Sequence, residues 1–177
     1  MIAAALAKFG KRDFLVNNAG IYPPVPRLPE IDWPAYEKTF AVNVFGMLRC
    51  TSEAARLMKL GGRIINISSM ESIRPSGPGS AQYNVTKAAA NGATRASAVD
   101  LANLGIRVNA VLPGLIKTEG TARMPQEMLD GIAAQAPSGR VGEPQDIAAA
   151  VLFLASPASS YVNGHCLVVE GGTTIKG

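Results

Sequence analysis

The feature that most constrains this fold is the alternation of short apolar runs with longer segments of helical periodicity. Runs that predict strands lie at residues 14–16, 63–67, 106–112 and 166–169. Helical patterns precede and separate them, at residues 2–9, 33–59, 81–103, 126–134 and 144–155. Strands that alternate with helices form a parallel sheet covered on both faces, and its buried strands are apolar throughout. The sequence predicts a doubly wound α/β domain with about four parallel strands.

The length and net charge of the chain further limit the kinds of protein it can be. The 177 residues contain no internal repeat or linker, so we expect one domain over residues 1–177. The net charge of +4 is dispersed along the chain, which argues against a nucleic-acid partner. The apolar run at residues 147–155 is too short to span a bilayer, and no signal-peptide pattern occurs. We therefore expect a cytoplasmic protein without a membrane partner.

The metal-binding side chains are too few for a metal site. Cys50, Cys166 and the single histidine, His165, do not have metal-ligand spacing, so we predict no metal. The absence of a Gly-x-Ser-x-Gly motif, together with a lone histidine beside the last strand, also argues against a Ser-His-Asp hydrolase.

A tyrosine and a lysine mark the candidate chemistry. Tyr83 and Lys87 are four residues apart in the predicted helix 81–103, a spacing that places both side chains on one helix face. The helix follows a Ser, Pro and Gly-rich loop that leaves the carboxyl end of a strand, where open α/β sheets bind ligands. Ser69, at the start of this loop, could hydrogen-bond a substrate oxygen.

The proposed role of Lys87 is electrostatic. A free tyrosine has a pKa of about 10 and is a poor base at neutral pH. Lowering this pKa by about three units requires about 4 kcal/mol. An ammonium about 4 Å away supplies about that much at an effective dielectric constant of about 20. We therefore expect Lys87 to lower the pKa of Tyr83.

Several segments around this pair resemble the short-chain dehydrogenase/reductase family, and among its members the 3-oxoacyl-(acyl carrier protein) reductases and glucose dehydrogenases. The resemblance covers the whole chain in the right order. It rests on Tyr-x-x-x-Lys with an upstream serine and on residues 17–20 (NNAG), 42–46 (VNVFG), 65–69 (INISS), 113–118 (PGLIKT), 139–144 (GRVGEP) and 146–148 (DIA).

The resemblance implies a Rossmann-like fold and an NAD- or NADP-dependent enzyme that interconverts secondary alcohols and ketones. It implies that Tyr83 transfers the substrate proton, Lys87 lowers the Tyr83 pKa and holds the nicotinamide ribose, and Ser69 orients the carbonyl. Asn43 would anchor a water in the proton relay. The implied cofactor contacts are Asn18, Ala19, Gly20, Tyr83, Lys87, Pro113, Gly114, Ile116 and Thr118.

The chain departs from the family pattern in two places. The fourteen positions from Ser69 to Tyr83 exceed the usual spacing by one, which one extra loop residue would explain; Ser68 is the weaker candidate. The glycine-rich turn that binds the cofactor pyrophosphate has no counterpart, and the residue that separates NAD from NADP would lie beside it. We therefore expect either a fragment of a longer gene product or a partner-dependent remnant.

Two other functions remain open. The Ser-Tyr-Lys site could perform acid–base chemistry without a cofactor, such as an elimination, or the chain could be a non-catalytic partner subunit. The segments expected to contact a small alcohol or ketone substrate, residues 21–30, 70–80 and 115–135, carry no decisive pattern. The resemblance also implies a homodimer or homotetramer formed through helices 33–59 and 81–103.

Overall fold

Four parallel strands form the centre of the molecule in the computed structural model, which describes residues 2–10, 13–24, 26–58 and 61–176. They lie side by side in the order of the sequence: β1 (Phe14–Asn17), β2 (Arg63–Ile67), β3 (Arg107–Pro113) and β4 (Cys166–Val169). Each strand lies within a residue or two of the predicted run. The predicted α/β class and the strand number are confirmed.

The register brings the carboxyl ends of the strands to one edge of the sheet. Asn17 pairs with Asn66, and Ile67 pairs with Val111. Because all pairs are parallel, the residues that follow β1, β2 and β3 emerge beside one another.

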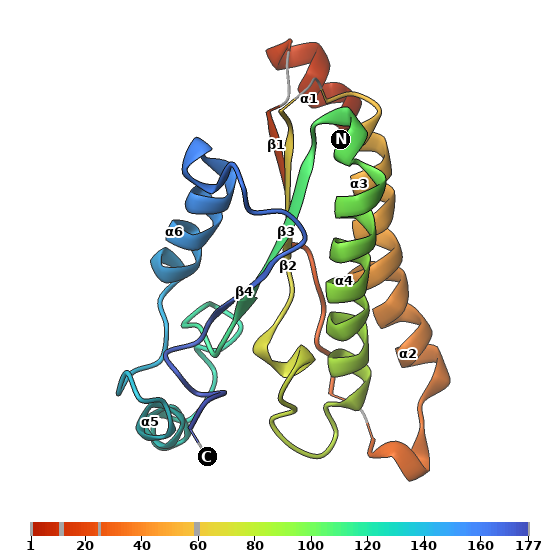
Figure 1. The fold of residues 1–177 in the computed structure, drawn as a ribbon. Coiled ribbons are helices and arrows are strands. Elements are labelled where there is room, and N and C mark those ends of the chain that lie inside the picture. The colour runs from red at the N-terminus through yellow and green to blue at the C-terminus, as the bar shows by residue number, and fades with distance from the viewer. Residues whose placement is uncertain (1, 11–12, 25, 59–60, 177) are drawn as a thin grey trace.

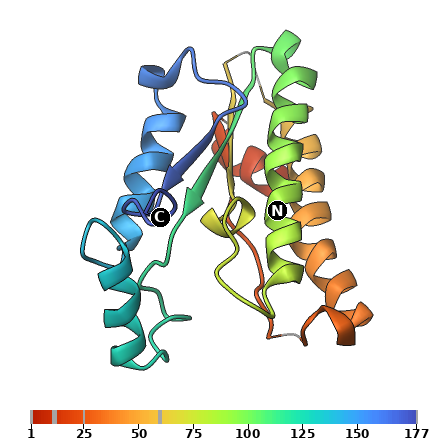
Figure 2. The same cartoon turned by 60° about the horizontal axis from the view of Figure 1, so that its bottom comes forward.

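Helices cover both faces of this sheet (Figures 1 and 2). On one side lie α1 (Ile2–Phe9), α2 (Trp33–Phe40), α3 (Met47–Ala55) and α4 (Ala81–Asp100). On the other side lies α6 (Pro144–Ala155), while α5 (Gln126–Gln135) sits beyond the carboxyl ends of the strands. The predicted doubly wound arrangement is therefore present.

The predicted helix from Trp33 to Lys59 is interrupted in the middle. A π-helical segment, Ala41–Gly46, joins α2 to α3, and α3 ends at Ala55. Lys59 lies outside the described residues. The apolar periodicity predicted helix correctly, but the extra residue of a π turn leaves no clear mark in such a pattern. Short π segments often occur at functional sites, and this one contains Asn43.

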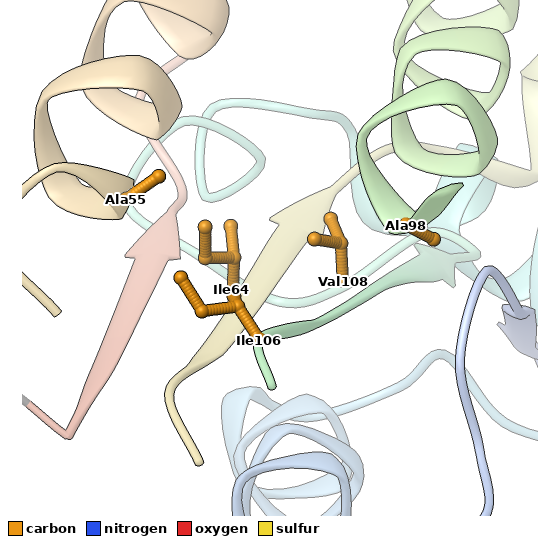
Figure 3. Packing of buried hydrophobic residues seen from close by; sticks show 5 residues of the cluster. All are labelled: Ala55, Ile64, Ala98, Ile106 and Val108. Atoms are coloured by element: carbon orange, nitrogen blue, oxygen red, sulfur yellow. The ribbon is translucent and has the colours of Figure 1, made fainter. Parts of the chain in front are cut away.

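Adjacent residues of β2 anchor the two sides of the core because side chains alternate across a strand. Ile64 packs with Ala55 of α3, Ala98 of α4, Ile106 and Val108 (Figure 3). Its neighbour Ile65 faces the opposite side, where it clusters with Val111 and Leu154. Ile64 and Ile65 are both fully buried. The sheet therefore holds α3, α4 and α6 in fixed positions relative to its carboxyl edge.

The described helices and acidic or sulfur-bearing side chains set two further limits. None of their helices is both long and apolar enough to cross a membrane. No group of three or more His, Cys, Asp or Glu side chains within them could hold a metal ion.

Candidate active site

A cavity of about 210 Å³ lies where β1, β2 and β3 end. It is lined by residues from the ends of these strands and from α4: Asn18, Gly20, Ile21, Tyr22, Ile67, Ser68, Ser69, Tyr83, Lys87, Pro113 and Gly114. Most of the predicted site residues therefore meet in one place, although more than sixty residues separate Asn18 from Lys87 in the sequence.

Three predicted cofactor residues do not line this small cavity. Ile116 lies in a separate pocket of about 130 Å³, where it forms a bridge with Gly142. Thr118 lines a larger cavity described below. Ala19 lies between two cavity residues but is not itself part of the wall.

Lys87 is buried and joins α4 to the end of β2. Its Nζ donates a hydrogen bond of 2.8 Å to the carbonyl oxygen of Ile67, the last residue of β2. The side chain is only 5% exposed, and this burial lowers the pKa of Lys87 to about 8. Lys87 can therefore exchange a proton close to neutral pH.

Tyr83 lies one helical turn before Lys87. The Lys87 Nζ is 5.4 Å from the centre of the Tyr83 ring. The pKa of Tyr83 is raised to about 12: burial raises it most, the charges of Glu71 and Tyr22 also raise it, and a hydrogen bond with the Ser69 side chain lowers it. The phenol is therefore protonated at neutral pH and available as a proton donor.

The predicted depression of the Tyr83 pKa by Lys87 is thus wrong for this structure. Burial of the phenol dominates, and no contribution from Lys87 offsets it. The ammonium makes its hydrogen bond to Ile67. Helical spacing placed the two side chains on one face, but it could not reveal the burial or the competing carbonyl oxygen.

The structure distinguishes between the two candidate serines. The Ser68 hydroxyl is buried and donates to the carbonyl oxygen of Lys87 at 3.0 Å. Its hydrogen bond therefore stabilises the backbone. Ser69 instead accepts a bond from the Glu71 backbone N–H at 3.1 Å and bonds the side chain of Tyr83. Ser69 is therefore the serine that faces the phenol.

Asn43 connects the site to the loop after β1. Its side-chain oxygen accepts from the Ile21 N–H at 2.8 Å, while its amide donates to the Ile21 carbonyl at 2.9 Å and to Thr86 at 3.1 Å. The side chain is 4% exposed. Asn43 therefore fixes the loop against α4, and its water-anchoring role stays a prediction.

The small cavity fits the nicotinamide end of a dinucleotide. A Cβ atom at Gly20 would stand 3.4 Å from both the Asn43 side-chain oxygen and the Lys87 Nζ, so the missing side chain leaves a polar cradle. Pro113 and Gly114 form another wall of this cavity. Polar groups around a space that a side chain would fill suit a ribose hydroxyl and a carboxamide.

A second cavity, of about 900 Å³, opens beside the first and is made mostly of loops. Its walls come from residues 70–76, 115–124 and α5, which lie within segments expected to contact a substrate, and from Thr173 and Lys176 near the C-terminus. The C-terminal residues were not predicted. They reach the cavity because Gly171 and Gly172 adopt positive φ angles of 71° and 89°, and Arg74 then donates to the carbonyl oxygens of Thr173 and Lys176. The paired glycines after β4 were the available signal.

Tyr22 is the other residue that the sequence did not single out. Its ring stacks on Tyr83 with the ring centres 4.3 Å apart and the planes inclined by 23°. It lines both the small and the large cavity. It lies two residues after the NNAG segment, within the segment 21–30 that was expected to contact substrate.

Known proteins are similar to this chain over nearly its whole length. Residues 1–174 match the sequence model of a family described as enoyl-(acyl carrier protein) reductase. The 3alpha-hydroxysteroid dehydrogenase of Mediterraneibacter gnavus is 44% identical over 178 residues, covering 97% of this chain and 68% of that protein.

Solved structures are also similar to this chain. The short-chain dehydrogenase/reductase from Serratia marcescens BCRC 10948 superposes with a TM-score of 0.92 at 36% identity, covering 98% of this chain and 70% of that one. A blue fluorescent protein from a metagenomic library, in complex with NADPH, gives 0.89 at 37% identity, covering 97% of this chain and 69% of that one.

Proposed function

Because the chain belongs to the short-chain dehydrogenase/reductase family of oxidoreductases, we propose that it interconverts a secondary alcohol and a ketone with NAD or NADP. The observation that carries this proposal is the meeting of Ser69, Tyr83 and Lys87 at the carboxyl edge of the sheet. The similarity to a structure in complex with NADPH supports a nicotinamide cofactor.

The roles of the residues follow from their contacts. When bound, the nicotinamide supplies or accepts the hydride. In the reductive direction, the hydroxyls of Ser69 and Tyr83 bind the carbonyl oxygen, and the Tyr83 phenol gives its proton to that oxygen. The raised pKa of Tyr83 keeps this proton in place at neutral pH.

Lys87 completes the proton path. With a pKa of about 8 it is partly charged near neutral pH, so it can return a proton toward the phenol after each turnover. Its ammonium also lies in the cradle left by Gly20, where it would meet the hydroxyls of the ribose.

The large cavity indicates the kind of substrate. Its apolar side chains include Met70, Leu115, Met124, Met128 and Ile132. A volume of about 900 Å³ lies near the upper end of the roughly 300–1,000 Å³ typical of small-molecule pockets. These features support a ketone that carries a bulky apolar group, in keeping with the steroid named for the M. gnavus relative.

We also propose a homodimer or homotetramer in the cytoplasm. Apolar side chains on the outer faces of the π segment, α3 and α4 are exposed: Phe45 by 51%, Leu48 by 38%, Val85 by 50% and Val99 by 77%. Such side chains support an interface on these helices. A folded monomer at micromolar concentration in light scattering would count against it.

Cofactor binding followed by turnover tests the central proposal. The protein is titrated with NADPH and NADH by fluorescence, and cofactor oxidation is then followed with cyclic and acyclic ketones. We expect one cofactor to bind and to be oxidised only when a ketone is present. Failure of a folded protein to bind either cofactor would refute the proposal, and elimination activity without cofactor would favour the acid–base alternative.

A further inference from the structure

Tyr22 is held in place from both ends. Asn43 bonds both backbone groups of the preceding residue, Ile21. At the other end, the Tyr22 side chain hydrogen-bonds Ser76, whose hydroxyl donates to Glu71 Oε1 at 2.7 Å. The loop after β1 is thereby tied to the loop that runs from Ser69 to Tyr83.

Glu71 extends this connection to α4. The Asn84 amide, in the orientation that satisfies its neighbours, donates to Glu71 Oε2 at 2.6 Å. Asn84 directly follows Tyr83 in α4. The ring of Tyr22 and the ring of Tyr83 are thus stacked between two segments that share one hydrogen-bond network.

Tyr22 also stands where the two cavities meet. It belongs to the wall of the small cavity and to the wall of the large one. A substrate that lies in the large cavity and presents its carbonyl group to Tyr83 would therefore pass against the Tyr22 ring.

We propose that Tyr22 is a positioning and specificity-determining residue, which holds the Tyr83 ring in its reactive orientation and limits the size of the group beside the carbonyl. This inference rests on the proposed ketone reduction. Stacked aromatic pairs favour one relative orientation of the rings, and a small misplacement of a reacting group costs a large part of the rate. Tyr22 is 54% exposed, so a ligand can contact its ring.

The test uses three variants and one control. Tyr22→Phe keeps the ring but removes the bond to Ser76, Tyr22→Leu keeps bulk without an aromatic face, and Tyr22→Ala removes the wall. The control is Tyr161→Ala, because Tyr161 is fully exposed and lines neither cavity. Each variant is compared by kcat and KM for a small methyl ketone and for a ketone flanked by a bulky ring.

We expect Tyr22→Leu to lower kcat roughly ten-fold for both ketones, with little change in KM. Tyr22→Ala should lower kcat similarly and shift the kcat/KM ratio toward the bulky ketone by roughly ten-fold. Tyr22→Phe should stay close to wild type. An unchanged kcat in Tyr22→Leu or an unchanged ratio in Tyr22→Ala would overturn the inference.

A second readout needs neither cofactor nor ketone. The ionisable groups around Tyr83 are Tyr22, Glu71 and Lys87. Burial is the main cause of the raised pKa of Tyr83, the stacked Tyr22 ring lies over one face of the phenol, and the charges of Glu71 and Tyr22 raise the pKa as well. In NMR titrations of ¹³C-labelled tyrosine, assigned with Tyr83→Phe, the Tyr83 midpoint should fall toward 10 in Tyr22→Ala but not in Tyr161→Ala. A midpoint that stays unchanged refutes the positioning role. A midpoint that falls in a protein that reduces no ketone instead refutes the proposed function and, with it, the specificity role.

Discussion

The two adjoining cavities are built in different ways. The small one takes its walls from the ends of β1, β2 and β3 and from α4, and its key side chains are buried or bonded to backbone. The large one is bounded by loops, by α5 and by a C-terminal segment held through Arg74. Regular structure therefore fixes the groups proposed to perform the chemistry, while loops shape the space for the substrate. Changes in the first should alter the reaction itself, and changes in the second should alter its selectivity.

The largest effect is expected at Tyr83. Tyr83→Phe removes the proposed proton donor and should lower kcat by about 10³-fold, since general acid–base groups typically contribute about 10²–10⁴. The rate of NADPH oxidation with a ketone measures this loss. The thermal midpoint should change little because the ring remains. Wild-type turnover in Tyr83→Phe would show that the small cavity is not where the reaction takes place.

The two neighbouring serines of the small cavity are expected to have different roles, one in catalysis and one in stability. Ser69→Ala should lower kcat by about 10²-fold, because it deletes a hydrogen-bond donor to the carbonyl oxygen. Ser68→Ala should leave most of the activity but lower the free energy of unfolding by about 1 kcal/mol, because it loses a buried bond to the backbone. Urea unfolding and steady-state kinetics on both variants test this division. The reverse pattern would make Ser68 the catalytic serine.

Lys87 links the chemistry of the small cavity to its stability. Burial lowers the folded-state pKa of Lys87 from 10.5 to about 8. Between these values the unfolded chain binds more protons, so raising the pH stabilises the folded state. Relative to Lys87→Met, the wild-type chain should therefore gain about 3 kcal/mol of stability from below pH 8 to above pH 10.5.

Chemical denaturation of both proteins at pH 7 and pH 10.5 measures this difference, and the other lysines cancel because they are common to both. Above pH 10 the effect of Tyr83 has the opposite sign, since its raised pKa makes the unfolded chain release its proton first. This contribution also cancels in the comparison if the Tyr83 pKa is the same in both. A stability difference that does not depend on pH would mean that Lys87 is not desolvated.

The smallest effect is expected in the large cavity. Met128 lies on α5 and is 52% exposed. Met128→Ala should change the kcat/KM ratio between bulky and small ketones by about ten-fold, as the loss of apolar contact area in a pocket typically does. The kcat for the small ketone should stay the same. Leu152→Ala, an exposed apolar substitution on α6, is the control; an equal shift there would show that the cavity does not contact substrate.

Much of the fold followed from the pattern of apolar residues. Residues 63–67 and 166–169 form strands as predicted, because a short apolar run between helical segments has few other ways to be buried. The ends of β1 and α4 shifted by a few residues, where local caps and turns decide the boundary. The π segment at Ala41–Gly46 was missed because its side chains still fit a helical period.

The order of residues alone indicated which chemical groups the protein holds and the edge of the sheet at which they meet. Tyr83 and Lys87 share a helix face by spacing, and the parallel strands carry Asn18, Ser69 and Gly114 to one edge. Both results depend on local geometry, which the order of residues fixes.

The protonation of these groups and the choice between neighbouring side chains became clear only from the folded chain. It showed that Ser69 and not Ser68 faces the phenol, that burial raises the pKa of Tyr83, and that Lys87 bonds Ile67. It also brought Tyr22 onto Tyr83. Desolvation, aromatic stacking and competition for a carbonyl oxygen depend on atoms that are distant in the sequence, and these atoms come together only when the chain is folded.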